Sequence, residues 1–252
     1  MDFTFSDSHI LGFAIRAIFD IAIPFIMIFI AYKKFDGRLY PFLIGIVSMN
    51  LLVLPRIFLR NIFAPDPDNK VIDFLIFIFI GAACEEISRF LMMKYMMKNH
   101  DTIMDAVCYG IGHWGMELIP QCYYSIDAIN TCNEINRTGY EGMISGLSVE
   151  ETAVFAEKLE MYMSLTLPDN LIIMIICIFS MAMQISWSVL AFIAIYRPDR
   201  RIYLLGALIT HILMNIYVSG FVFELTAAAA ICFFTYLAAK ESDLPVKQNY
   251  YI

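Results

Sequence analysis

Three short groups of ionisable and amide residues interrupt the apolar stretches of this sequence. The groups are Glu85, Glu86 and Arg89; His113 and Glu117; and His211 and Asn215. Within each group, residues that are three or four positions apart share one face of a helix. Carboxylates and imidazoles brought together in this way can activate a water molecule by acid–base catalysis or bind a divalent metal ion.

The first group has a second interpretation as an ion pair. Arg89 lies four residues after Glu85 and three after Glu86, so its guanidinium can hold one carboxylate through paired hydrogen bonds. For these three residues alone, a structural ion pair that fixes the register of the helix is an equally good interpretation. That interpretation loses weight because two other stretches repeat the pattern.

The composition is that of a membrane protein. The chain has 252 residues, of which 60% are hydrophobic and 16% charged, and its mean hydropathy is +0.68. Soluble domains contain about 25% charged residues. The net charge of -7 argues against a nucleic-acid partner, because no basic face is available. A single helical domain spanning residues 1–252 fits this length.

Seven stretches are long and apolar enough to cross a bilayer as helices. We expect these spans at residues 10–32, 39–62, 71–97, 102–127, 169–196, 201–219 and 220–239. The fold class predicted from them is an all-α membrane protein, a polytopic bundle of about seven transmembrane helices.

The distribution of lysine and arginine predicts the orientation of this bundle. Ten basic residues lie in the loops after the first, third and fifth spans and in the C-terminal tail: Lys33, Lys34, Arg38, Lys94, Lys98, Arg197, Arg200, Arg201, Lys240 and Lys247. Four lie on the opposite side: Arg60, Lys70, Arg137 and Lys158. We therefore expect a multi-pass protein of the cell membrane with its N-terminus outside and its C-terminus in the cytoplasm.

The longest predicted loop, at about residues 128–168, lies outside and contains one helix. Ser148 and Glu151 match a capping box at the start of this helix. Apolar residues then recur every three or four positions: Val149, Ala153, Ala156, Leu159 and Met163, with Phe155 beside them. We expect an amphipathic helix on the outer surface, with this stripe against lipid or the bundle.

The three polar groups lie at similar depths in their predicted spans. Glu85, His113 and His211 each lie about 10–12 residues from the cytoplasmic end, a depth of about 15–18 Å. Charged residues are costly near the bilayer midplane and usually mark functional sites. Glycines of the fourth span would let a neighbouring helix approach closely: Gly110, Gly112 and Gly115. We expect one shared polar site.

Other polar residues within the spans have simpler interpretations. Arg16 and Asp20 are four residues apart and are expected to pair with each other. Arg56 is expected to extend toward the lipid headgroups. Gln184 and Ser186 are expected to form hydrogen bonds between helices or to line a cavity.

The order and spacing of the polar groups resemble the YhfC-type family of intramembrane metalloproteases. The motifs are Glu85-Glu86-x-x-Arg89, Gly112-His113-x-Gly115-x-Glu117 and His211-x-x-x-Asn215, which follow one another in the family's order. That family resembles in turn the CAAX prenyl proteases and bacteriocin-processing enzymes and, more distantly, PrsW. The chain differs from the CAAX-protease pattern in the position of the arginine. It also has Trp114 where the YhfC-type pattern usually has glycine, and this bulk is expected to narrow the cavity.

The resemblance implies an intramembrane endopeptidase. In proteases of the CAAX type the first glutamate, here Glu85, activates a water molecule with help from the histidine of the second motif, here His113. Arg89 would orient Glu85 and Glu86, and His211 and Asn215 would stabilise the oxyanion. In the alternative, metal-dependent form of this chemistry, a divalent ion such as zinc would be held by ligands from the same set: His113, Glu117, His211 and Glu85. No other cofactor is indicated.

Two other functions use the same residues. A non-catalytic membrane scaffold, or a peptide-binding protein of the bacteriocin-immunity type, would bind a peptide without hydrolysing it. A proton-coupled transporter would also need buried acids and histidines, but its inverted repeats are not visible in the sequence. The expected partners are membrane lipid and a peptide or membrane-protein substrate. The sequence does not indicate the substrate's identity, the side to which the site opens, or an oligomeric state.

Overall fold

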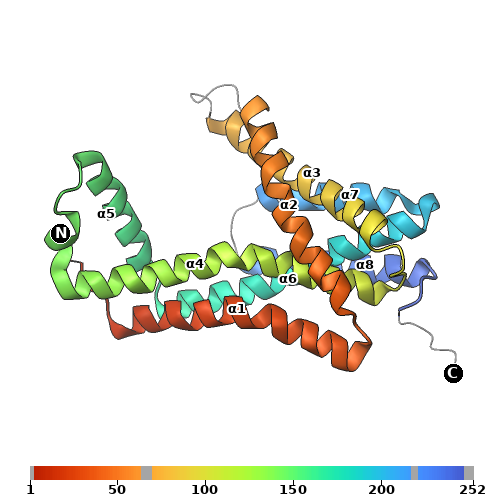
Figure 1. The fold of residues 1–252 in the computed structure, drawn as a ribbon, viewed down its shortest axis with the longest axis horizontal. Helices are drawn as coiled ribbons and strands as arrows, with labels where there is room; N and C mark the ends of the chain where they lie inside the picture. Colours follow the sequence, from red (N-terminus) through yellow and green to blue (C-terminus); the bar gives the residue numbers. More distant parts are fainter. Residues whose placement is uncertain (1–2, 64–69, 217–220, 247–252) are drawn as a thin grey trace. The chain divides into compact units, whose positions relative to one another are not determined.

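A computed structural model describes residues 3–63, 70–216 and 221–246, and these residues form helices with no strand among them (Figure 1). The helices are α1 (Asp7–Phe35), α2 (Leu39–Phe63), α3 (Lys70–Met96), α4 (Ile103–Ile144), α5 (Val149–Ser164), α6 (Leu167–Tyr196), the short 3₁₀ helix η1 (Pro198–Arg200), α7 (Ile202–Ile216) and α8 (Phe221–Glu241). The prediction of an all-α protein is confirmed. Lys247 and the predicted boundary between the last two spans, at residues 217–220, lie outside the described residues.

Four helices are long and apolar enough to cross a membrane: α1, α2, α6 and α8. The other three predicted spans fall on α3, α4 and α7. Charged side chains interrupt α3 and α4, and the described part of α7 has only 15 residues. Seven spans and their orientation therefore stay predictions.

The chain divides into two compact units. One consists of Met1–Ile23 and Leu118–Cys177, and the other of Pro24–Glu117 and Ile178–Ile252. Helices α1, α4 and α6 contribute segments to both units. The motif residues from Glu85 to Asn215 all belong to the second unit, which we call the site unit.

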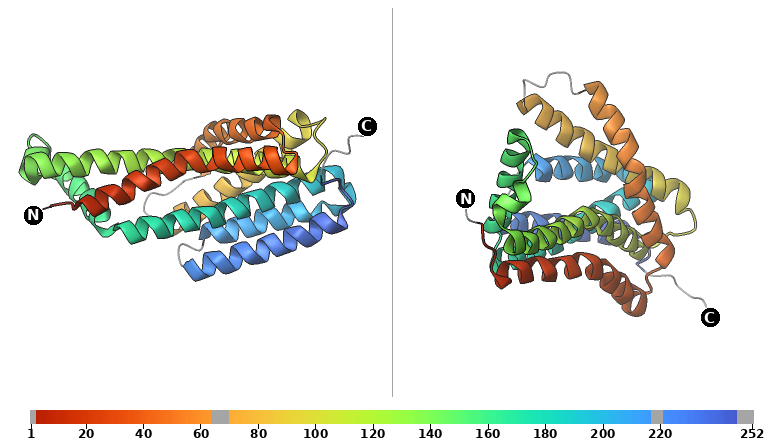
Figure 2. Two further views of the ribbon diagram at one scale, coloured as in Figure 1. Left: turned by 90° about the horizontal axis from the view of Figure 1, so that it is seen from below. Right: turned by 60° about the vertical axis from the view of Figure 1, so that its left-hand side comes forward.

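The core of the site unit forms around α6. Four consecutive residues of this helix, from Leu190 to Ile193, are at most 1% exposed. A helix that is apolar on every face is stable only when neighbours cover all of its sides. Side chains from α3, α4, α7 and α8 pack in the same hydrophobic cluster, and α6, α7 and α8 lie side by side (Figure 2). Helix α3 contacts both α2 and α7.

Glycines let α4 approach its neighbours closely, as predicted. A Cβ atom built on Gly112 would lie 2.0 Å from the carbonyl oxygen of Phe42 in α2, and one on Gly45 of α2 would lie 2.1 Å from that of Tyr109. A Cβ on Gly110 would lie 2.7 Å from the Cα of Ile185 in α6. The backbones of α2 and α4 are therefore in direct contact beside His113.

The segment predicted as an outside loop is largely helical. Helix α4 continues from the fourth predicted span as far as Ile144, with a non-helical backbone at Gly139 (φ 74°, ψ 166°). The physical reason is burial: three residues of α4 at positions i, i+4 and i+7 pack into a second hydrophobic cluster with Phe13 and Leu159. These residues are Ala128, Cys132 and Ile135. Apolar contacts thus extend the helix beyond the predicted span.

The amphipathic helix is present as α5, and its capping box is confirmed. The Ser148 hydroxyl accepts from the backbone N–H of Glu151 at 3.2 Å, and the Glu151 carboxylate accepts from the backbone N–H of Ser148 at 2.8 Å. Val149 is 90% exposed and Met163 is also exposed, so these ends of the predicted apolar stripe do not pack against the protein and their contact with lipid stays a prediction. The buried residues are Leu159 and Tyr162, whose hydroxyl donates to Asp127 of α4.

Candidate functional site

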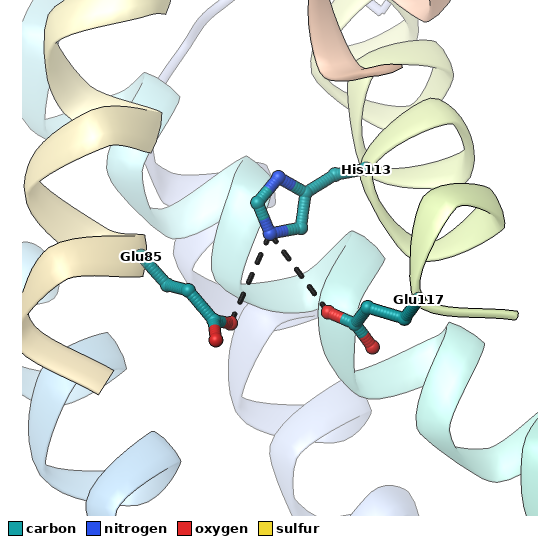
Figure 3. A group of neighbouring side chains, drawn as sticks. All are labelled: Glu85, His113 and Glu117. Carbon is teal, nitrogen blue, oxygen red and sulfur yellow. Dashed lines mark ion pairs between the residues drawn. The ribbon is translucent and has the colours of Figure 1, made fainter. Parts of the chain in front are cut away.

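A histidine and two glutamates converge in the site unit. Figure 3 shows Glu85 of α3 and Glu117 of α4 with their carboxylates directed at the same ring nitrogen of His113. The Nε2 atom of His113 lies 3.9 Å from Glu85 Oε2 and 3.8 Å from Glu117 Oε1. His113 is fully buried, and the side chains of Glu85 and Glu117 are 7% and 24% exposed. The first and second motifs therefore meet, as the sequence predicts.

The His113 Nε2 atom has no hydrogen-bond partner among the described residues. Both carboxylate oxygens lie too far away for a hydrogen bond to this nitrogen. A buried polar atom without a partner is costly unless water, an ion or a ligand satisfies it. One ligand atom from each of Glu85, His113 and Glu117 lies within 4.8 Å of the others, and imidazole with carboxylates is a donor set that suits zinc. These three residues therefore fit a divalent metal ion.

His211 of α7 connects to this group through the glutamates of α3. Its Nδ1 lies 2.9 Å from Glu86 Oε1 and its Nε2 lies 3.3 Å from Glu85 Oε2. The ring of Trp187 stacks on the imidazole, with centroids 4.1 Å apart and an interplanar angle of 10°. Because both ring nitrogens face carboxylates, His211 bridges the two glutamates and links α7 to α3. Its contact with the His113 group passes through Glu85.

Arg89 forms its hydrogen bonds with residues of α6 and not with the glutamates of α3. Its Nε lies 3.4 Å from Glu86 Oε2, and it makes no paired hydrogen bonds with a carboxylate among the described residues. Its terminal nitrogens instead donate to the backbone carbonyl of Gln184 at 2.9 Å, to the side-chain oxygen of Gln184 at 2.6 Å and to the Ser188 hydroxyl. Arg89 is fully buried, and these bonds satisfy its two terminal nitrogens, whose burial inside the helices would otherwise be costly.

Gln184 is a site residue for which the sequence analysis predicted only hydrogen bonding between helices or a place in the cavity lining. Arg89 donates to its Oε1, so its Nε2 points the other way and donates to Glu117 Oε1. The amide thus links Arg89 to one carboxylate of the His113 group. A single glutamine inside an otherwise apolar span was the only signal for this residue.

Arg56 was predicted to reach the lipid headgroups, and this prediction is wrong. Its Nη1 lies 3.5 Å from Glu85 Oε1, so the guanidinium turns inward toward the site. The guanidinium lies against Gly81 of α3, where an added Cβ atom would be 2.5 Å from Arg56 Nη2. Nothing in the spacing of α2 indicates that Arg56 would reach α3.

Two further residues of the motifs lie at the edge of the site. Asn215 is half-buried one turn after His211, and the described residues offer it no hydrogen-bond partner. Trp114 is 1% exposed, next to His113 in α4.

An apolar groove lies between α3 and α7. It has a volume of about 320 Å³ and is lined by Ala83, Glu86, Ile87, Phe90, Leu91, Arg201, Leu204, Leu205 and Leu208. Glu86 is its contact with the site, and Arg201 is its other charged residue. All of its other lining side chains are apolar, which suits an apolar chain segment better than a polar small molecule.

The comparisons with known proteins agree with the motifs. The sequence profile of the YhfC intramembrane metalloprotease family matches residues 19–232. The chain is 29% identical over 133 residues to the uncharacterized membrane protein YhfC of Bacillus subtilis (strain 168), an alignment that covers 52% of this chain and 50% of that protein. The chain therefore spans about half the length of the curated relative it matches. No solved structure matches the chain. This multi-pass membrane protein belongs to the YhfC intramembrane metalloprotease family.

Proposed function

We propose that this protein is an intramembrane endopeptidase that hydrolyses a peptide bond in or near the bilayer. The observation that supports the proposal most strongly is the buried Nε2 of His113, which has no hydrogen-bond partner in the described part of the chain and is faced by two carboxylates. In this proposal the whole chain is one transmembrane helical domain. Seven helices cross the membrane, and the N-terminus lies outside.

A divalent ion such as zinc would be held by His113, Glu85 and Glu117. When bound, such an ion supplies Lewis-acid polarisation of the scissile carbonyl. His211, which the sequence also suggests as a ligand, has both nitrogens directed at carboxylates. We therefore assign it to hydrogen bonding and not to the ion.

The chain's own residues would move the protons. Water attacks the carbonyl carbon while Glu86, the site carboxylate that is not assigned to the ion, accepts the proton that the water loses. The tetrahedral intermediate collapses when the C–N bond breaks, and the same carboxyl group returns the proton to the leaving amine. Asn215 donates a hydrogen bond to the developing oxyanion, whereas His211, whose two nitrogens face Glu85 and Glu86, holds these carboxylates in place. Arg89 holds Glu86 and, through Gln184, Glu117 in place.

Cleavage by protein reconstituted in liposomes tests this function, with a panel of internally quenched apolar peptides as the probe. We expect Glu85→Gln and His113→Gln each to lower kcat/KM at least about 100-fold. Ser125→Ala is the matched control, because Ser125 is fully buried and, among the described residues, its hydroxyl bonds only to the carbonyl of Gln121 in its own helix. Full activity in both site variants would contradict the proposal.

A non-catalytic, peptide-binding scaffold is the second candidate. It is favoured by the fact that Glu85, Glu86 and His211 already satisfy one another, as in a purely structural network. This candidate predicts that the wild-type protein binds the peptides without cleaving them, and that Glu85→Gln binds them equally well.

A further inference from the structure

Ser48 of α2 contacts the catalytic histidine at the nitrogen that faces away from the carboxylates. Its Oγ lies 3.0 Å from His113 Nδ1, and both residues are fully buried. In Figure 3 this ring nitrogen points away from Glu85 and Glu117, whereas Nε2 points at them. No sequence motif includes Ser48.

The second hydrogen bond of Ser48 determines whether its hydroxyl donates to His113 or accepts from it. Its Oγ lies 2.7 Å from the backbone carbonyl of Gly45. A carbonyl oxygen can only accept, so the single hydroxyl proton of Ser48 must point at Gly45. If that proton pointed at His113, two acceptor oxygens would face each other at 2.7 Å. The Ser48 oxygen therefore accepts at His113, and Nδ1 carries the proton.

The close crossing of α2 and α4 makes this contact possible. A Cβ atom on Gly45 would lie 2.8 Å from the backbone nitrogen of His113, besides its collision with Tyr109. Only glycine at this position lets α2 approach far enough for Ser48, three residues later, to reach the imidazole. The serine and the glycine act as one unit.

We infer that Ser48 is a positioning residue that holds His113 in the Nδ1–H tautomer, so that the Nε2 lone pair is directed into the site. A histidine that binds a metal commonly donates its other ring N–H to a neighbouring acceptor, which fixes both tautomer and ring orientation. The same tautomer is needed if Nε2 accepts a proton instead. The inference rests on the proposed function in one respect only, namely that Nε2 binds a metal ion or accepts a proton.

Nitrogen-15 NMR of histidine-labelled protein in bilayers tests the tautomer directly. The chain contains only four histidines, and the signals that disappear in His113→Gln are those of His113. At pH 8, in chelator-treated protein, we expect a protonated Nδ1 and an unprotonated Nε2 in the wild type. In Ser48→Ala the Nδ1 acceptor is gone, and we expect a substantial population of the Nε2–H tautomer.

Zinc titration of the same samples gives a readout that does not depend on cleavage. We expect Ser48→Ala to bind zinc about 10–100-fold more weakly than the wild type, and Ser48→Thr, which keeps the hydroxyl, to recover most of that loss. Ser125→Ala is the control for removing a buried serine hydroxyl elsewhere. It should change neither the tautomer nor the affinity.

Two results would overturn the inference: a wild-type His113 protonated at Nε2, or an unchanged tautomer in Ser48→Ala. The wild-type spectrum decides the first even if the variant does not fold. If the wild type has the expected tautomer but binds no zinc and cleaves no peptide, the proposed function fails and the role of Ser48 stands. If cleavage is observed with the opposite tautomer, only the role of Ser48 fails.

Discussion

Among the described residues, helices α1, α2, α6 and α8 are long and apolar enough to be identified as membrane spans, whereas polar side chains interrupt α3 and α4 and the described part of α7 is too short. The second group contains every motif residue, from Glu85 in α3 to Asn215 in α7. The polar side chains that build the site are the same ones that lower the hydropathy of α3 and α4. In a membrane protein, the helices hardest to recognise as spans are therefore those to examine for chemistry.

The apolar helices α2 and α6 supply hydrogen-bond and ion-pair partners for the buried polar side chains of the other helices. Helix α2 contributes Ser48 and Arg56, which contact His113 and Glu85. Helix α6 contributes Gln184, with further bonds from its backbone. These polar groups of the two apolar helices lie where α2 and α6 contact the site. The comparison thus predicts that substitutions at these contacts lower stability or activity far more than similar substitutions elsewhere.

The largest effect on stability is expected for Arg89→Met. Removing this buried guanidinium leaves the Glu86 carboxylate without its neighbouring cation and the side-chain oxygen of Gln184 without its donor, and the loss of one member of a buried pair costs about 3–5 kcal/mol. Unfolding in mixed micelles measures this loss. Arg137→Met is the control, because Arg137 pairs with Glu134 at the surface, where its side chain is 73% exposed. Equal stability of the two variants would contradict the prediction that contacts at the site contribute more to stability than contacts at the surface.

The second prediction concerns the crossing of α2 and α4. In Gly112→Ala the new Cβ would collide with the carbonyl oxygen of Phe42, so the two helices must separate, at a cost of about 1–3 kcal/mol. Gly206→Ala in α7 is the matched control, because no described atom outside its own stretch of helix lies within 4 Å of its added Cβ. Alanine is the better helix former, so this control should be neutral or slightly more stable. The same unfolding assay distinguishes the two outcomes.

The third prediction sharpens the role of the groove between α3 and α7. If the groove admits the substrate, Leu205→Trp fills it and raises KM roughly tenfold, with kcat and zinc affinity unchanged. Ile209→Trp is the control, because Ile209 has similar exposure on α7 but does not line the groove. Steady-state cleavage of the apolar peptides measures both. Equal KM values in the two variants would exclude this groove as the route.

The smallest effect is expected at the capping box of α5. The hydrogen bond from the Ser148 backbone N–H holds the pKa of Glu151 below its ordinary value of 4.5. A carboxyl whose folded pKa is depressed stabilises the helix above its unfolded pKa, and this stabilisation is lost as the pH falls through the folded pKa. Amide protection of α5 should therefore drop several-fold below about pH 4, as measured by hydrogen exchange.

Glu151→Gln is the control for the capping box. Its hydrogen-bond acceptor is retained but it does not titrate, so the drop in protection should disappear. A drop of the same size in this variant would assign the pH dependence to another group.

The sequence predicted those parts of the fold and site that depend on local spacing. The three motifs meet through Glu85, the pair of Arg16 and Asp20 forms at 3.8 Å, and the capping box of α5 is present. Each of these features follows from residues three or four positions apart on one helix or from a depth that several helices share.

The remaining features depend on contacts between helices that spacing does not reveal. Arg56 turns toward Glu85 because α2 packs against α3, and Ser48 reaches His113 because two glycines let α2 and α4 touch. The continuation of α4 beyond the fourth predicted span depends on burial against Phe13 and Leu159. Such contacts are set by the packing of distant segments, and no periodicity in a single segment reports them.

The most direct test of the central claim is a zinc titration of the purified protein and three variants, Glu85→Gln, His113→Gln and Glu117→Gln. If these side chains form one metal site, the wild type binds one ion per chain, and each substitution weakens binding at least about tenfold. Binding that is absent in the wild type, or that survives unchanged in all three variants, would contradict the account.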